Sequence, residues 1–186
     1  MKKRKSFLIP ALIIILGAGL AAFIFLSKRP TISRLQAGKD FNVILITIDT
    51  LRADRLGCYG YTPDVTPTLD RWAGQGVRFT RCIAQTPLTL PSHTTIMTGT
   101  LPIHHGVRDN GGFVVPDELQ TLAECFQSAG YKTAAFVSAY VVDSKWGLNQ
   151  GFDYYFDSFD LGRFEKISLG EVQRRAEDTI GEALSW

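Results

Sequence analysis

Two oxygen-bearing side chains stand where short apolar segments of the sequence end. Asp49 directly follows the run LITI, and Thr89 comes a few residues after the alternating segment VRFTRCIAQ. In open α/β sheets, reactive groups gather at the carboxyl ends of strands, so both residues are candidates for one site. Asp49 could hold a divalent metal ion as a hard oxygen ligand, or it could cap the turn that follows it.

Thr89 precedes a predicted helix from about Pro91 to Thr98, in the stretch TPLTLPSHTTIMTG. Thr, Ser and Pro favour helix starts, so capping explains this residue in one way. Nucleophilic attack is the other explanation, because the amino end of a helix offers free backbone N–H groups and a positive dipole end to phosphate or sulfate oxygens. A threonine hydroxyl needs a base or a metal to react. A divalent ion held by Asp49 and Thr89 would activate the hydroxyl.

Further polar residues surround this segment. His93 could contact the substrate or the nucleophile, or it could brace the turn. Ser92 and Asn110, the latter beside a Gly-Gly turn, are predicted to line the substrate cleft. His104 and His105 precede a glycine-rich turn and are predicted to be structural.

The elements that would position these residues alternate between strands and helices. Strands are predicted at 41–49, 77–85 and 132–140, and helices at 67–76, 91–98, 116–131 and 171–186. This alternation predicts an α/β fold with a mostly parallel sheet flanked by helices. Three predicted strands make an unfinished sheet, so we expect the fold to be incomplete at the carboxyl end and the protein to continue after Trp186.

Several other residues are predicted to be structural. Thr66 is expected to cap the helix that begins at Pro67, and Gly74 or Gly76 to end it. The aromatic residues expected to pack in the core are Trp72, Phe79 and Trp146, and those expected to tie down the loop after Asp49 are Arg52, Asp54 and Arg55. The cysteines Cys58, Cys82 and Cys125 allow at most one disulfide, lack metal-ligand spacing, and are expected to be buried or half-buried.

The amino-terminal segment predicts a membrane anchor. Residues 6–27 carry no charge, and a helix of this length spans about 33 Å, close to the hydrocarbon thickness of a bilayer. Four of the first five residues are basic, so the amino terminus should stay in the cytoplasm. We predict a basic tail at 1–5, an anchor at 6–27, a linker at 28–40 and a periplasmic or extracellular domain at 41–186. A cleaved signal peptide is the alternative.

The charge distribution argues against a nucleic-acid partner. The formal net charge is +2, but six basic residues lie within positions 1–29. From Pro30 onward, 14 basic residues stand against 18 acidic ones. Proteins that bind nucleic acids normally present a basic face.

Four ordered blocks of the chain resemble the sulfatases, in the alkaline-phosphatase-like superfamily of metal-dependent phospho- and sulfohydrolases. The blocks are NVILITIDTLRADRLGCYG, TPTLDRWAGQGVRFTRCIAQ, TLPSHTTIMTGTLPIHHGV, and GYKTAAFV with GLNQGFDYY, within residues 41 to about 160. The resemblance implies that Asp49 is the first aspartate of a metal-binding pair. Many sulfatases have a second aspartate where this chain has Thr50, so that ligand is missing or different.

The resemblance departs from the sulfatase pattern at the nucleophile. Sulfatases oxidise a cysteine or serine of a C/S-x-P-S-R motif to formylglycine, and here Thr89 and His93 stand at the first and last positions of that motif. Threonine cannot become formylglycine, so we expect none. Phosphodiesterase-like and phosphotransferase members of the superfamily use threonine. Ser138 and Tyr140 replace a lysine and a histidine of the family, which also favours phosphoesters over sulfate esters.

The resemblance therefore implies a membrane-anchored enzyme that hydrolyses or transfers sulfuric or phosphoric esters. Thr89 would be the nucleophile on a divalent ion (Zn, Ca, Mn or Mg) held by Asp49. Family members take further metal ligands from later in the chain, so we expect these 186 residues alone to be inactive. The alternative is a non-catalytic anchored module, or an inactive fragment, that retains the sulfatase scaffold.

Overall fold

The computed structural model of this chain describes residues 41–164 and 172–186. It divides into two compact units, residues 1–47 and 48–186, and the elements below all lie in the second. The predicted tail, anchor and linker lie outside the described residues. Within the described ranges, no helix combines the length and the apolar character that a membrane span needs.

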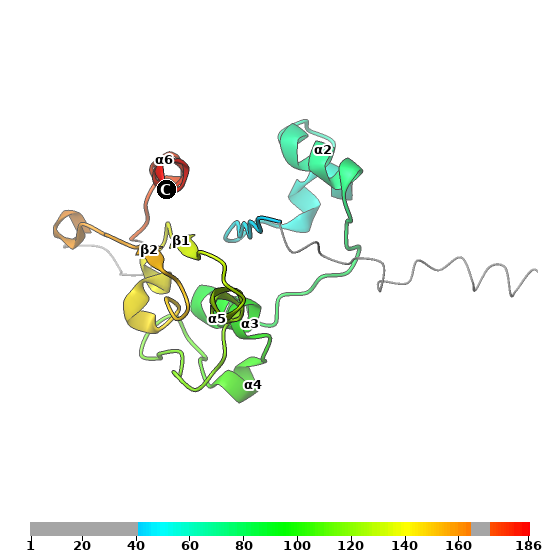
Figure 1. Cartoon of the computed structure of the whole chain (residues 1–186). Helices are drawn as coiled ribbons and strands as arrows, with labels where there is room; N and C mark the ends of the chain where they lie inside the picture. Colours follow the sequence, from blue (N-terminus) through cyan, green and yellow to red (C-terminus); the bar gives the residue numbers. More distant parts are fainter. Residues whose placement is uncertain (1–40, 165–171) are drawn as a thin grey trace, which may run out of the picture. The chain divides into compact units, whose positions relative to one another are not determined.

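Helices alternate with two short strands along the second unit (Figure 1). The helices are α2 (Pro67–Gln75), α3 (Thr89–Thr98), α4 (Pro102–His105), α5 (Leu122–Ser128) and α6 (Ala176–Ser185). The strands are β1 (Ala134–Phe136) and β2 (Tyr154–Phe156). Five 3-10 turns complete the described elements: η2 (Ala53–Arg55), η3 (Gly57–Tyr59), η4 (Tyr140–Val142), η5 (Ser144–Trp146) and η6 (Leu161–Phe164).

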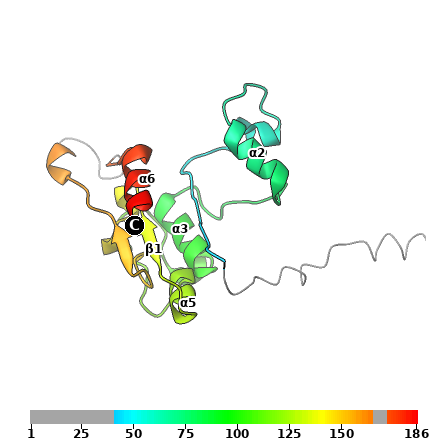
Figure 2. The ribbon, with the colours of Figure 1, turned by 45° about the horizontal axis from the view of Figure 1, so that its top comes forward.

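The two strands form a parallel sheet, with Ala134 opposite Tyr154 and Phe136 opposite Phe156. This confirms the middle of the strand predicted at 132–140 and adds β2, which we did not predict. Helix α6 packs beside β1 (Figure 2), where the Tyr154 hydroxyl donates to Glu182 at 2.6 Å. The described sheet is thus parallel and flanked by helices, as expected of the α/β class.

The strands predicted at 41–49 and 77–85 are not strands in the structure. Their apolar side chains are exposed, Ile44 to 83% and Val77 to 79%. A strand of a parallel sheet is defined by hydrogen bonds to neighbours and by cover on both faces. Among the described residues the only paired strands are β1 and β2, and one isolated antiparallel bridge joins Ala139 and Gln173. The apolar pattern alone was therefore insufficient to make these two segments strands.

Helix α2 begins with Pro67 and ends before Gly76, as predicted. Thr66 is the cap residue of α2, as predicted, but its side chain makes no capping hydrogen bond. Its hydroxyl instead donates to Asp70 at 3.0 Å and accepts from the backbone N–H of Gly57 at 3.1 Å. Thr66 therefore ties α2 to the preceding loop.

Helix α5 is shorter than the predicted 116–131. It begins after Thr121, whose hydroxyl accepts from the Glu124 N–H while the Glu124 carboxylate accepts from the Thr121 N–H. This reciprocal pair is a capping box, which fixes the helix start at this point in the sequence. The chain leaves the helix near Gly130, which has a φ of 87° that favours glycine. Helix α6 falls within its predicted range.

The core of the second unit gathers around the start of α3. Its buried members are Leu90, Val107, Val115, Val142 and Leu148. The predicted packing role of Trp146 is consistent with its contact with this cluster. Trp72 and Phe79 are exposed, to 53% and 67%, so their predicted burial is wrong. All three cysteines are free, and Cys82 and Cys125 are exposed, contrary to expectation.

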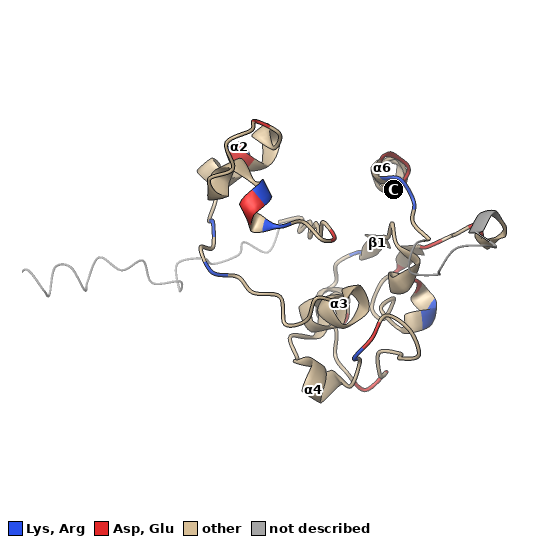
Figure 3. Ribbon diagram, turned by 180° about the vertical axis from the view of Figure 1, so that it is seen from behind, with Lys and Arg blue, Asp and Glu red and all other residues tan. Residues whose placement is uncertain are grey.

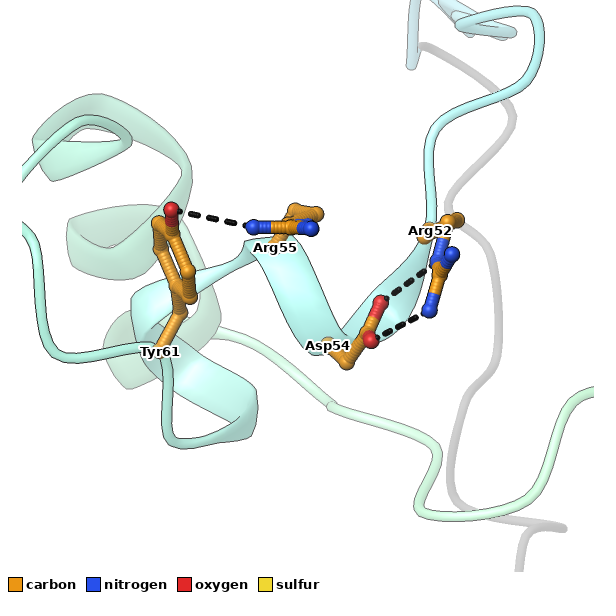
Figure 4. A network of polar contacts seen from close by, with 4 residues as sticks. All are labelled: Arg52, Asp54, Arg55 and Tyr61. Atoms are coloured by element: carbon orange, nitrogen blue, oxygen red, sulfur yellow. Dashed lines mark hydrogen bonds and ion pairs between the residues drawn. The ribbon is translucent and has the colours of Figure 1, made fainter.

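The loop after Asp49 is held by short-range polar contacts (Figure 4). Arg52 and Asp54 form a two-pronged ion pair at 2.9 and 2.7 Å, and Arg55 donates to the Tyr61 hydroxyl at 3.2 Å. The ion pair lowers the pKa of the Asp54 carboxyl. Both partners are exposed, so the pair adds little to stability. These residues organise the loop itself, which agrees with their predicted structural role.

Candidate functional site

The structure brings Asp49 and Thr89 together, although they lie 40 residues apart in the chain. The Thr89 hydroxyl donates to a carboxylate oxygen of Asp49 across 3.2 Å. Asp49 is exposed and Thr89 is half-buried. The two residues therefore present adjacent oxygens at the surface of the second unit.

Thr89 is itself the first residue of α3, whose cap residue is Leu88. The predicted start at Pro91 is two residues late. Proline marks the first turn of a helix and not its first residue, because none of the N–H groups in that turn has a helical partner. Leu90 is fully buried and anchors that turn in the core. The nucleophile candidate is thus attached to a firmly packed helix start.

Asp49 lies in a tight turn over 48–51, closed by the N–H of Leu51 donating to the carbonyl of Ile48 at 3.4 Å. Thr50 has a φ of +54° in this turn and is the only residue other than glycine with a positive φ in the described part of the chain. The left-handed region is costly for a β-branched residue. The backbone beside Asp49 is therefore strained.

Ser92 and His93 lie one helical turn after Thr89, at the i+3 and i+4 positions that share its face of the helix. The Nδ1 atom of His93 is 2.8 Å from the main-chain carbonyl oxygen of Thr89. A carbonyl only accepts, so Nδ1 carries the proton and donates it. His93 therefore contacts the candidate nucleophile through its backbone, and Ser92 is half-buried on the same face.

Asn110 lies at the amino end of α3. Its side-chain oxygen accepts from the backbone N–H of Leu90 at 2.9 Å. The N–H of Ser92 donates to Leu88 at 3.0 Å, and Pro91 has no N–H. The expectation of several free N–H groups at this helix start is therefore wrong. Of the first four residues, only Thr89 retains an N–H that makes no hydrogen bond within the described residues.

The helices that carry the site are uncharged. Neither α3 nor α4 contains a Lys, Arg, Asp or Glu residue (Figure 3). The negative charge next to Thr89 is thus supplied by Asp49 from another segment.

The oxygen donors of Asp49 and Thr89 suit a hard divalent cation. Two oxygens bound to one ion lie about 3.0 Å apart in an octahedral site with 2.1 Å bonds and about 3.3 Å apart in a tetrahedral one. The observed separation of 3.2 Å lies within this range. No group of three or more His, Cys, Asp or Glu side chains forms a metal site within the described ranges. The pair accordingly matches part of a coordination sphere.

His105 is 1% exposed and connects α4 to α3. The N–H of Val107 donates to its Nδ1 at 3.1 Å, so the proton resides on Nε2, which is 3.1 Å from the Thr95 hydroxyl. That hydroxyl donates to the carbonyl of Pro91 at 3.0 Å. Neutral His105 therefore braces the first turn of α3, as predicted for a structural residue, while His104 is exposed.

Burial of His105 should make folding stability sensitive to acid. Burial lowers the pKa of His105 below its ordinary 6.5, outweighing the opposite effect of the Pro91 carbonyl. The unfolded chain then takes up a proton near pH 6.5 while the folded one resists. We expect the free energy of unfolding to fall as pH drops below about 6.5, by at most about 1.4 kcal/mol per pH unit from this group. Urea unfolding followed by tryptophan fluorescence from pH 7.5 to 5 measures this slope.

The control for this prediction is a pair of variants. His105→Gln should flatten the slope relative to the unmodified protein, whereas His104→Gln, at an exposed position, should leave it unchanged. Equal slopes in all three proteins would contradict the assignment to His105.

Ser138 and Tyr140 follow the carboxyl end of β1. The Ser138 hydroxyl lies 2.8 Å from that of Thr179 in α6. The nearly buried Tyr140 contacts the ammonium group of Lys145 through its hydroxyl, and that ammonium also lies 4.5 Å from the centre of the Trp146 ring. The sequence did not predict this contact between Lys145 and Tyr140.

Comparison with known proteins identifies one family. The family described as Sulfatase matches residues 41–166. Human arylsulfatase A is 33% identical over 148 residues, which cover 76% of this chain and 24% of that enzyme. An N-acetylglucosamine-6-O-sulfatase of Bacteroides thetaiotaomicron is 35% identical over 117 residues, covering 61% of this chain and 20% of that enzyme. The chain thus spans about a quarter or less of the length of these two relatives.

Two solved structures resemble the fold. A 2-O GAG sulfatase superposes with a TM-score of 0.53 and 27% identity, covering 60% of this chain and 24% of that one. A phosphonate monoester hydrolase of Agrobacterium radiobacter superposes with a TM-score of 0.52 and 26% identity, covering 60% and 25%. Both matches support the α/β fold assigned above.

Proposed function

Because this chain belongs to the sulfatase family, we propose that it carries the nucleophile of a metal-dependent hydrolase or transferase of sulfuric or phosphoric esters. The observation that supports this most directly is the 3.2 Å contact between the Thr89 hydroxyl and the Asp49 carboxylate. An uncharged run at residues 6–27 after a basic tail supports a membrane anchor with the amino terminus in the cytoplasm. The catalytic part would then act in the periplasm or outside the cell.

The reaction begins at Thr89. Its oxygen attacks the phosphorus or sulfur of the ester, a new bond forms there, and the bond to the alcohol oxygen breaks. The hydroxyl proton passes to a water molecule, and the departing alcohol takes up a proton from solvent. Water or an acceptor alcohol then attacks the threonyl ester and releases Thr89. A divalent cation bound by Asp49 and Thr89 would lower the pKa of the hydroxyl and offset the charge of the ester oxygens.

The neighbouring side chains are suited to hold an anionic ester. Ser92 shares the Thr89 face of α3, and its hydroxyl is a donor of the kind that binds phosphate or sulfate oxygens. Asn110 already uses its side-chain oxygen on Leu90, so its amide nitrogen is the group that would donate to substrate. His93 remains beside the nucleophile on the same turn. We place Ser92 and Asn110 in the substrate site and His93 in the catalytic one.

We favour phosphoric over sulfuric esters, because threonine cannot be converted to formylglycine. The similar proteins include sulfatases and a phosphonate monoester hydrolase by name, so both sulfur and phosphorus esters occur as substrates in their names. The metal would be a divalent ion, one of Zn, Ca, Mn or Mg. No formylglycine is needed for a threonine nucleophile.

A non-catalytic anchored module is the second candidate. It is favoured by the absence, among the described residues, of any group of three or more His, Cys, Asp or Glu side chains that could hold a metal ion. In this case the scaffold would serve binding alone, and no ester would be turned over.

A substrate panel distinguishes these candidates. The protein, in its longest natural form, is stripped with a chelator and assayed on aryl phosphodiesters, phosphomonoesters and sulfates with Zn, Mn, Mg or Ca restored. We expect metal-dependent hydrolysis with phosphoesters preferred. Preference for sulfates would overturn the phosphoester assignment, and absence of turnover with every ester and metal would favour the non-catalytic module.

A further inference from the structure

Two side chains hold the peptide group between Thr89 and Leu90 from opposite ends. The carbonyl oxygen of this group accepts from Nδ1 of His93 at 2.8 Å. Its N–H, on Leu90, donates to the side-chain oxygen of Asn110 at 2.9 Å. His93 comes from the same helix and Asn110 from a loop 20 residues further along the chain. One planar unit therefore carries both contacts.

The two contacts act on one rigid body. A peptide group is planar and its two ends cannot rotate independently. Hydrogen bonds in series also polarise each other, so a donor at the carbonyl strengthens the N–H at the other end as a donor. Loss of either contact should weaken the other.

The held peptide group is the one that follows the candidate nucleophile. Its orientation sets the ψ angle of Thr89 and thereby the direction of the bond to the hydroxyl-bearing carbon. That hydroxyl must reach the Asp49 carboxylate at 3.2 Å. On the other side of the peptide, Leu90 is fixed by complete burial.

We propose that His93 and Asn110 form a coupled pair of positioning residues that aims the Thr89 hydroxyl at Asp49. The kinetic part of this proposal rests on the proposed function, whereas the coupling itself does not. The role is distinct from proton transfer by the ring.

Helix α3 provides a matched control. The hydroxyl of Thr98 donates to the carbonyl of Thr94 at 2.7 Å, which is the same i to i−4 contact that His93 makes. No side chain among the described residues accepts from the N–H at the other end of that peptide group. Thr98→Val therefore removes a contact of this kind that has no second side chain at the same peptide group, together with the contacts of the Thr98 hydroxyl to Thr100.

The first test measures the coupling without any activity. In protein labelled with ¹⁵N-leucine, hydrogen exchange of the Leu90 amide is compared in the unmodified protein, His93→Ala, Asn110→Ala and Thr98→Val. We expect exchange to accelerate about tenfold in Asn110→Ala and severalfold in His93→Ala, and to stay unchanged in Thr98→Val. Unchanged Leu90 exchange in His93→Ala would overturn the proposal. Should Asn110→Ala not fold, Asn110→Asp keeps the accepting oxygen and should protect Leu90 as the native residue does.

The second test is a double-mutant cycle on the ester found in the substrate panel. Each alanine variant should lower kcat about tenfold, and the double variant should lose little more kcat than either single one. The KM of His93→Ala should stay within about twofold of the native value, whereas Asn110→Ala also removes the amide nitrogen proposed to bind substrate. Losses of kcat that multiply, or a loss in His93→Ala that falls on KM, would overturn the positioning role. The pH dependence of kcat in His93→Gln should have the same shape as in the native protein, with lower rates throughout. Loss of the acidic or the basic limb of this profile would also overturn the positioning role. If the native protein turns over no ester, the proposed function fails while the exchange result still decides the coupling.

Discussion

Thr89→Ala should reduce ester hydrolysis by about a thousandfold or more, since removal of a nucleophile leaves only the catalysis that the remaining groups provide. Folding should be little affected, because the side chain is half-buried and its hydroxyl contacts only Asp49 among the described residues. Steady-state kinetics on the preferred ester, with thermal unfolding alongside, measures both effects.

Thr89→Ser is the conservative variant, which keeps an attacking oxygen and should retain part of the activity. Thr95→Ser changes a threonine on the same helix that does not contact Asp49, and should be close to native. Rapid quenching followed by mass spectrometry should find the phosphoryl or sulfuryl group on Thr89 in the native protein. Undiminished turnover in Thr89→Ala would rule out the threonine nucleophile.

Asp49→Asn should produce the second large loss, of about a hundredfold or more in kcat/KM at a fixed metal concentration. Asparagine can still accept the hydrogen bond from Thr89, but it lacks the charge that binds a divalent ion. Asp49→Asn therefore distinguishes binding of the divalent ion by Asp49 from orientation of the Thr89 hydroxyl by Asp49. Titration of the stripped protein with Zn, Mn, Mg or Ca, read by activity and by calorimetry, should show weakened metal binding.

Asp54→Asn is the matched control, because Asp54 lies in the same loop, is also exposed and pairs with Arg52. It should leave metal affinity and turnover near native. If Asp49→Asn responds to metal as the native protein does, Asp49 is not a metal ligand.

Helix positions were the most predictable part of the fold. Pro67 and Gly76 bound α2 as expected, since proline favours a first turn and glycine a helix end. The strands were less predictable, because pairing with another segment defines a strand. The segment LITI has the right composition for a buried strand and remains exposed, whereas the three residues of β2 carry no apolar alternation and still pair with β1.

The candidate site was predictable in its members and unpredictable in their contacts. Asp49 and Thr89 were singled out because each follows a predicted strand, and the structure places them 3.2 Å apart although neither preceding segment is a strand. For His93 the sequence left open whether it contacts the substrate or braces the turn, and the structure shows a contact with the backbone of Thr89.

By itself the sequence determined which chemical groups are available: a carboxylate, a threonine hydroxyl, an imidazole and an amide, with prolines and glycines that bound the helices. It also carried the family resemblance, through motifs whose order is written in the chain. Only the tertiary structure decided that the His93 and Asn110 side chains meet on one peptide group and that Thr50 turns through a left-handed conformation. Contacts of this kind depend on how distant segments meet in space, and that is set by packing around Leu90 and its neighbours rather than by local residue preference.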